Sequence, residues 1–190
     1  YIVTPTLPPD LRPTPRGSTT TVGDPGAAVR AYAQLQPELA AAAAECVQLL
    51  TSTLDDAGID YLTVTGRAKS VSSFATKAAR TAGGGPVYTD PLLEITDQIG
   101  VRVITYVRSD VAAVADLVGE EAEVLDDRDL GRETASEGRF GYASRHLLVE
   151  LDAERTGPRL HRMLRGRPVQ IQIRTVLQHA WAEFEHDIRY

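Results

Sequence analysis

The feature that most constrains the fold is a strictly alternating run near the C-terminal end of the sequence. Residues 169–174 read Val-Gln-Ile-Gln-Ile-Arg, so apolar and polar side chains exchange at every step. Because successive side chains of a β-strand point to opposite faces, this run predicts a strand with one face on a core and one polar face. Residues 101–107 are rich in β-branched side chains and predict a second strand. The chain therefore needs a sheet that is apolar on one side.

Helix signals lie before, between and after these strands. An Ala-rich stretch predicts helix over about 26–56, divided in two at Pro37 and ended by Gly58. Further helices are expected over about 70–81, over 111–120 with Asp110 as its cap, and over 175–188. The last of these is amphipathic, and its apolar side carries Leu177, Trp181 and Phe184.

Shorter patterns complete the prediction. Additional strands are expected over 61–66, at 124–125 and over 146–151. Residues 126–140 have no clean period and predict a loop, and the Arg-rich segment 153–166 predicts a connector. We therefore expect an α+β fold, with a mixed central sheet of about five strands flanked by helices.

Composition limits the domain count and the class of protein. A chain of 190 residues with 43% apolar content supports one domain with a real core, here predicted over 26–190. Residues 1–25 hold six of the eleven prolines and predict a flexible arm. The net charge of −6 argues against binding to bulk nucleic acid, and the single Cys46 excludes a disulfide framework. Without a signal-peptide pattern or a membrane-spanning run, we expect a cytoplasmic protein that makes no membrane contact.

The two lysines of the chain lie close together. Lys69 and Lys77 are eight residues apart, whereas the other eighteen cations among its 20 Lys and Arg residues are all arginine. Ser70 is a candidate N-cap, and at helical spacing Ser73, Lys77 and Arg80 then share one face. Arg67 ends the preceding strand. Several such donors beside a helix N-terminus are typical of a polyphosphate site.

Other polar residues stand where a ligand would need them. Asp97 immediately precedes a predicted strand, and Gly100 follows it, an arrangement that suits a Mg²⁺ ligand. Tyr142 offers a flat ring on which a nucleobase can stack, with His146 nearby. Neither a Walker loop, a GxGxxG fingerprint nor a Gly-x-Ser-x-Gly elbow is present, which disfavours three common enzyme classes.

Taken in order, these motifs resemble the synthetase domain of the RelA/SpoT family over about residues 40–190. The matching pieces are Arg67-x-Lys69-Ser70-x-x-Ser73-x-x-x-Lys77-x-x-Arg80, Asp97-x-x-Gly100-x-Arg102, Gly141-Tyr142-x-Ser144-x-His146, and Gln172-Ile173-Arg174-Thr175. The resemblance implies a small alarmone synthetase with a nucleotidyltransferase-like fold. Such a GTP pyrophosphokinase transfers pyrophosphate from ATP to the 3′-hydroxyl of GDP or GTP, with Mg²⁺, giving ppGpp or pppGpp and AMP.

The resemblance also assigns roles to individual residues. The ATP-binding set falls on Arg67, Lys69, Ser73, Lys77, Arg80 and Arg102. The set for the acceptor nucleotide falls on Tyr142, His146, Gln172, Arg174 and Arg139. Asp97 takes the place of the family's metal-binding aspartate, and Gln170 takes a second catalytic and metal-binding position.

Gln170 departs from the family pattern, which has Glu there. An amide keeps a ligating oxygen but cannot act as a general base. Three explanations stay open: an introduced Glu-to-Gln change, a naturally weak or silent relative, or compensation by another carboxylate such as Glu183 or Glu185. A smaller departure is Gly138, where many relatives have Lys, with Arg139 next to it.

The departures leave alternatives to the leading function. One is a catalytically silent nucleotide-binding relative, and another is a toxin that pyrophosphorylates adenine nucleotides or the 3′ end of tRNA. The arginines of 155–167 are consistent with the tRNA alternative. The sequence leaves open whether the chain forms a homo-oligomer, or has tRNA or a neutralising antitoxin as a partner.

Overall fold

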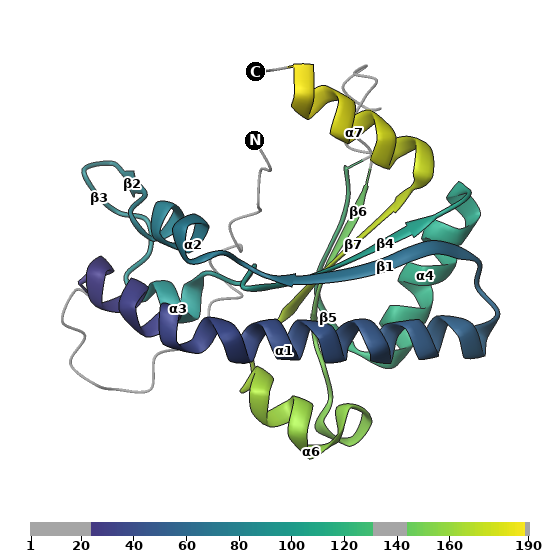
Figure 1. Ribbon diagram of the computed structural model, residues 1–190, viewed down its shortest axis with the longest axis horizontal. Helices are drawn as coiled ribbons and strands as arrows, with labels where there is room; N and C mark the ends of the chain where they lie inside the picture. The colour runs from purple at the N-terminus through teal and green to yellow at the C-terminus, as the bar shows by residue number, and fades with distance from the viewer. Residues whose placement is uncertain (1–23, 131–143, 189–190) are drawn as a thin grey trace.

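The computed structural model describes residues 24–130 and 144–188. Five strands form one sheet, in the spatial order β1-β4-β7-β6-β5 (Figure 1). Their bounds are Tyr61–Ala68 for β1, Ile99–Thr105 for β4, Glu123–Asp129 for β5, Arg145–Glu150 for β6 and Val169–Thr175 for β7. Only β4 and β7 pair in parallel, and the other neighbours pair antiparallel. The predicted mixed sheet of five strands is confirmed.

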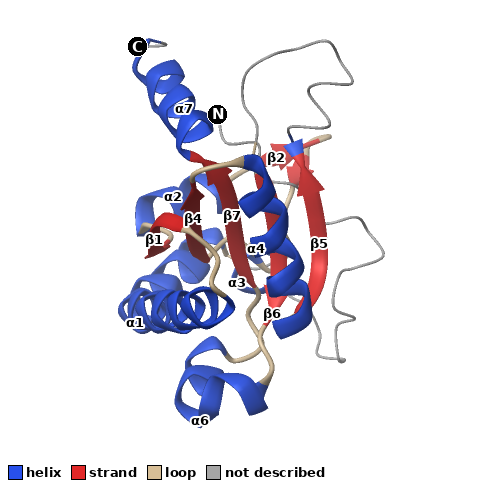
Figure 2. Ribbon diagram, turned by 90° about the vertical axis from the view of Figure 1, so that its right-hand side faces the viewer, coloured by secondary structure: helices blue, strands red, loops and turns tan. Residues whose placement is uncertain are grey.

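The helices and a small hairpin surround this sheet. The helices are α1 (Pro25–Ala57), α2 (Val71–Ala78), α3 (Pro91–Glu94), α4 (Arg108–Glu121), α6 (Ala153–Leu164) and α7 (Val176–Ile188). A hairpin of β2 (Thr81–Ala82) and β3 (Gly85–Pro86) follows α2. In Figure 1, α1 runs below the sheet, and α7 stands above it on the opposite side. Figure 2 shows α4 in front of β7 and β6. No helix within the described ranges is long and apolar enough to cross a membrane.

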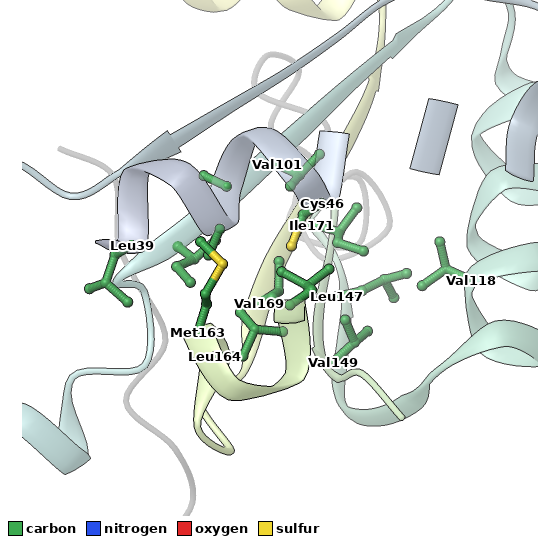
Figure 3. Packing of buried hydrophobic residues seen from close by; sticks show 14 of the residues in the cluster. Leu39, Cys46, Val101, Val118, Leu147, Val149, Met163, Leu164, Val169 and Ile171 are labelled. Atoms are coloured by element: carbon green, nitrogen blue, oxygen red, sulfur yellow. The ribbon is translucent and has the colours of Figure 1, made fainter. Parts of the chain in front are cut away.

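The hydrophobic core lies between the apolar face of the sheet and helices α1, α4 and α6 (Figure 3). It is built from the apolar positions of the alternating strands, which are less than a tenth exposed. Strand contributions include Val101, Leu147, Val149, Val169 and Ile171, and helix contributions include Leu39, Cys46, Val118, Met163 and Leu164. Burying this surface is the main stabilising contribution to the fold.

The opposite face of the sheet is polar, and strand register lines its residues up in rows. One row joins Thr65, Arg102, Gln172 and His146, because Arg102 pairs with Thr65 and Gln172, and Gln172 pairs with His146. The next row joins Arg67, Gly100 and Gln170. Paired residues share a face, so the predicted polar face of residues 169–174 continues onto β1, β4 and β6.

Gly66 lets β1 pack closely on α1. A Cβ at this position would lie 2.6 Å from Val47 Cγ2 and 2.8 Å from the backbone oxygen of Ala43. Both distances are well inside normal van der Waals contact. The absence of a side chain therefore fixes how near β1 approaches the helix, and with it the position of Arg67.

Several predicted boundaries are wrong. Pro37 does not divide the first helix, because buried Tyr32 and Leu39 hold α1 on the core on both sides of an exposed proline. Residues 126–129 belong to β5, and residues 153–164 form α6, kinked at Gly157 with φ 72°.

Two further expectations about helices need correction. Helix α4 begins at Arg108, before Asp110, whose carboxylate accepts from the Val107 amide at 3.4 Å from within the first turn. Leu177, Trp181 and Phe184 of α7 are at least half exposed, because the inner side of this helix faces the polar side of the sheet. Gly58 ends α1 in the left-handed conformation, as predicted.

Candidate functional site

A buried cluster of two lysines and one aspartate lies where β1 ends and β4 begins. Lys69 Nζ is 2.8 Å from Asp97 Oδ2, and Lys77 Nζ is 3.0 Å from Asp97 Oδ1. The side chains of Lys69, Lys77 and Asp97 are 15%, 7% and 9% exposed. One carboxylate therefore faces two ammonium groups in a place with little water.

The cluster shifts the pKa values of its members. Burial raises the pKa of Asp97, but Lys77 and Lys69 together outweigh burial, so the pKa lies below its ordinary value of 3.8. Burial lowers the pKa of Lys77 from its ordinary value of 10.5, and Asp97 offsets only part of that effect. Because Asp97 is ionised and cannot neutralise two lysines, the cluster attracts anions.

Helix α1 and the loop before β4 hold Lys69 in place. The Tyr32 hydroxyl donates to the backbone oxygen of Lys69 at 2.8 Å, and the Lys69 amide donates to the backbone oxygen of Gln98 at 2.8 Å. The Tyr32 ring stacks on Phe74 of α2, with centroids 4.0 Å apart and planes within 2°. Sequence reasoning missed Tyr32, because its contact with Lys69 spans 37 positions and leaves no local signal.

Helix α2 begins as predicted. The Ser70 side chain accepts from the Ser73 amide at 3.2 Å and donates to the Ser73 hydroxyl at 2.8 Å. Arg67, Ser73 and Arg80 are exposed, and no ion pair within the described ranges involves either arginine. The helix N-terminus, Lys69, Lys77 and these exposed donors make one cationic region.

A hydrogen-bonded chain crosses three strands of the polar face. Arg102 Nε donates to Gln172 Oε1 at 3.1 Å, and Gln172 Nε2 lies 2.9 Å from His146 Nε2. The Ser144 hydroxyl is 2.8 Å from the same ring nitrogen. Both Ser144 and His146 are buried, at 3% and 6% exposure. These hydrogen bonds align a guanidinium, an amide and an imidazole along one row of the sheet.

The direction of these bonds fixes the tautomer of His146. Arg102 Nε can only donate, so Gln172 Oε1 accepts and the amide nitrogen of Gln172 must donate. His146 Nε2 is therefore an acceptor, and in the neutral ring the proton is on Nδ1. His146 then carries a lone pair toward Gln172 and an N–H on its other side.

Helix α7 adds a carboxylate to the polar face. Glu183 Oε1 is 3.9 Å from Arg174 Nη2, 4.0 Å from Arg102 Nη1 and 3.5 Å from His179 Nδ1. Burial lowers the pKa of His179, and Arg174 lowers it further, with Glu183 acting in the opposite direction. Glu183 thus places a carboxylate beside two guanidinium groups, and its side chain is 61% exposed.

Comparison with known proteins bears on this arrangement. Residues 66–190 match the family described as "Region found in RelA / SpoT proteins". This stretch contains the lysine cluster together with Arg102, Gln172 and His146 of the polar face. The chain belongs to this family. The resemblance drawn from its motifs is confirmed.

The relatives are small alarmone synthetases and a pyrophosphokinase. GTP pyrophosphokinase YjbM of Bacillus subtilis (strain 168) is 32% identical over 132 residues, which are 67% of this chain and 56% of that protein. The chain therefore spans a little over half the length of this curated relative. Small alarmone synthetase 1 of Bacillus subtilis is 25% identical with a TM-score of 0.64, covering 84% of this chain and 79% of that one. Its structure bound to its product pppGpp gives 25% and a TM-score of 0.61, covering 85% and 82%.

The structure brings most of the predicted RelA/SpoT-type site residues to one side of the molecule. Register on the sheet puts Arg67, Arg102, Gln170, Gln172 and His146 on its polar face. Lys69 follows β1 directly, and Arg174 continues the alternation of β7. Tyr142 and Arg139 lie outside the described residues, so their predicted acceptor-binding roles stay predictions.

The predicted magnesium site does not fit the arrangement as it stands. Magnesium prefers carboxylate oxygens backed by phosphate and water, and Asp97 has the right chemistry. However, both of its oxygens face ammonium groups, at 2.8 and 3.0 Å. Gln170, the second expected ligand, is an uncharged amide. No group of three or more His, Cys, Asp or Glu side chains suited to a metal occurs in the described part of the chain.

Proposed function

We propose that the chain transfers a pyrophosphoryl group from ATP to the 3′-hydroxyl of GDP or GTP, giving ppGpp or pppGpp and AMP. The curated relative at 32% identity carries the name GTP pyrophosphokinase, and a related structure is described with pppGpp as its product. The observation that carries the proposal is the buried pair Lys69 and Lys77, which lies where β1 ends, next to the polar face of the sheet. The reaction needs ATP and the acceptor nucleotide to be held in line for the transfer, and this surface supplies donors for both.

On the donor side, the cationic region would hold the ATP phosphates. Lys69 and Lys77 are compact ammonium donors, and the start of α2 adds backbone N–H groups that favour negative charge. Arg67 and Arg80 are exposed and available to the outer phosphates. These groups would orient the β-phosphorus and stabilise the charge that the leaving AMP develops.

On the acceptor side, the hydrogen-bonded row would position the guanosine nucleotide. Arg102 and Arg174 provide guanidinium groups, and buried His146 helps to hold the side chain of Gln172 in place. In the reaction the acceptor 3′-oxygen bonds to the β-phosphorus, and the bond from that phosphorus to the α–β bridging oxygen breaks. The bridging oxygen leaves with AMP, and the 3′-hydroxyl proton passes to a base.

The identity of that base is open to experiment. Gln170 cannot take a proton. Glu183 lies beside Arg102 and Arg174, which places a carboxylate on the polar face without the family's glutamate. We propose Glu183 as the compensating base. Changing Glu183 to Gln is then expected to lower the turnover number roughly 100-fold or more, with unchanged nucleotide affinity.

A product assay tests the proposed function. The protein and a Gln170→Glu variant are incubated with ATP, Mg²⁺ and GDP, GTP or ADP, and the nucleotides are separated by ion-exchange chromatography. We expect AMP and a 3′-pyrophosphorylated guanosine nucleotide in equal amounts, with a higher rate for the variant. If neither protein forms such a product from any acceptor, the enzymatic proposal is wrong.

A silent nucleotide-binding relative is the second candidate, and Gln170 favours it. This candidate predicts nucleotide binding without product even after Glu is restored at position 170. The tRNA alternative gains little from the Arg-rich segment. In α6, Arg155 pairs with Glu121 and Arg159 pairs with Glu45, and α6 packs on α1, away from the polar face.

A further inference from the structure

The disagreement between the lysine cluster and the expected metal site points to a specific order of events. The carboxylate of Asp97 has the chemistry of a divalent-cation ligand, yet its two oxygens lie 2.8 and 3.0 Å from ammonium groups. Its two partners are also the groups best suited to phosphate. The same three side chains therefore have two alternative arrangements, with and without a polyphosphate.

We infer that Lys69 and Lys77 lock Asp97 in the nucleotide-free protein, and that a polyphosphate opens the lock by taking both lysines. Only then does Asp97 become a ligand for a divalent cation. This inference rests on the proposed function for the identity of the polyphosphate. It makes the metal site a property of the nucleotide complex rather than of the protein alone.

Charge explains why the lock excludes a free cation. Two ammonium groups and one carboxylate leave the cluster with an excess positive charge, which repels a divalent cation in a site with little water. A polyphosphate brings several negative charges and accepts charge-assisted hydrogen bonds from both lysines. Asp97 then loses its partners while still largely buried, and it would hold a divalent cation whose charge offsets its own.

Linkage gives the inference a consequence that can be measured without turnover. If Asp97 competes with phosphate for the lysines, removing its charge must strengthen the binding of a metal-free polyphosphate. The same change must also abolish the gain in affinity that the cation provides. Coupling between two sites is reciprocal, so each ligand has to favour the other through Asp97.

The first test is an Asp97→Asn variant, titrated calorimetrically with AMPCPP, an ATP analogue, in EDTA. We expect affinity about fivefold or more above that of the wild-type protein. Adding Mn²⁺ should tighten binding to the wild-type protein more than to the variant. The matched control is Asp116→Asn, which removes the same charge from an exposed position on α4 and should bind as the wild type does. Equal or weaker metal-free binding by Asp97→Asn overturns the lock.

A second test protects against a variant that fails to fold. Wild-type protein is titrated with Mn²⁺ alone, and the free ion is followed by electron paramagnetic resonance. Without polyphosphate, we expect no saturable Mn²⁺ site with a submillimolar dissociation constant. With AMPCPP present, we expect one such site on the protein, in addition to the Mn²⁺ that AMPCPP binds by itself. A nucleotide-free wild-type protein that binds one Mn²⁺ in that range overturns the inference. The product assay judges the proposed function separately, because an active enzyme can still fail both binding tests.

Discussion

Two neighbouring glycines offer a matched pair of substitutions with opposite consequences. Gly66 lies on the core side of β1, and Gly100 lies on the polar side of β4, in the register pair of Arg67. A Cβ at position 66 would meet Val47 Cγ2 at 2.6 Å and the Ala43 backbone oxygen at 2.8 Å. A Cβ at position 100 would meet only the Gln170 backbone oxygen, at an ordinary 3.9 Å.

The distances set the expected magnitudes. At position 66 normal contact requires β1 and α1 to separate by about 1 Å, and the Ala43 oxygen cannot rotate away. We expect Gly66→Ala to lower the free energy of unfolding by about 2 kcal/mol, as overpacking does, and the melting temperature by roughly 4–8 °C. We expect Gly100→Ala to stay within about 0.5 kcal/mol of the wild type.

For nucleotide affinity we expect the opposite order, with Gly100→Ala more affected than Gly66→Ala. If nucleotides lie on the polar face, the new methyl group of Gly100→Ala weakens nucleotide binding roughly tenfold or more. Thermal unfolding followed by circular dichroism and calorimetric titration with AMPCPP measure the two effects. Equal loss of melting temperature in both variants would refute the packing argument. Unchanged affinity in Gly100→Ala would refute the placement of the nucleotide.

Three further predictions concern the lysine cluster. Replacing Lys77 by Met removes a charge-assisted bond to phosphate and should weaken AMPCPP binding roughly tenfold or more by calorimetry; unchanged affinity would remove Lys77 from the site. Because the pKa of Asp97 is lowered in the folded protein, its stabilising contribution is complete above the ordinary carboxyl value of 3.8 and is lost as pH falls through the lower folded value. Urea midpoints of wild type and Asp97→Asn should therefore converge as pH drops from 6 to 3, and a gap independent of pH contradicts this. Tyr32→Phe keeps the stack on Phe74 but loses the bond to the Lys69 carbonyl, which should cost about 1 kcal/mol in unfolding free energy and also weaken AMPCPP binding; loss of stability alone would make Tyr32 structural only.

Local chemistry was readable from the sequence where local contacts decide the structure. Ser70 caps α2 because its hydroxyl reaches an amide three residues on, which spacing alone predicts. The alternation of 169–174 predicted both the strand and its polar face, since side-chain direction in a strand depends only on position. Residue type and spacing also led to the prediction of a polyphosphate site, which stays a prediction.

Long-range contacts account for what the sequence did not predict. A proline inside a helical pattern usually ends the helix, but the buried side chains of Tyr32 and Leu39 on either side of Pro37 keep α1 continuous. The segment 153–164 looked like a connector because Arg and the Gly157-Pro158 step dominate it. Its helical signal was the spacing of Leu160, Met163 and Leu164, which the structure buries.

The ion pairs of Asp97 with both Lys69 and Lys77 could not be predicted from the sequence either. It depends on β1 and β4 pairing antiparallel, so that Lys69 and Asp97 meet across a gap of 28 positions. Residue type predicted a phosphate site and a metal ligand separately. Their contact in the structure is what led us to infer that the two compete for the same side chains.

The position of β7 has a consequence for how the protein is made. Among the described strands β7 comes last in sequence but lies at the centre of the sheet, between β4 and β6. During synthesis the ribosome must release residues up to Thr175 before Gln172 can join Arg102 to His146. Strand pairing over such long separations is slow. A nascent chain that has not yet paired β7 therefore lacks the complete polar row, and any activity that needs this row has to wait for that pairing.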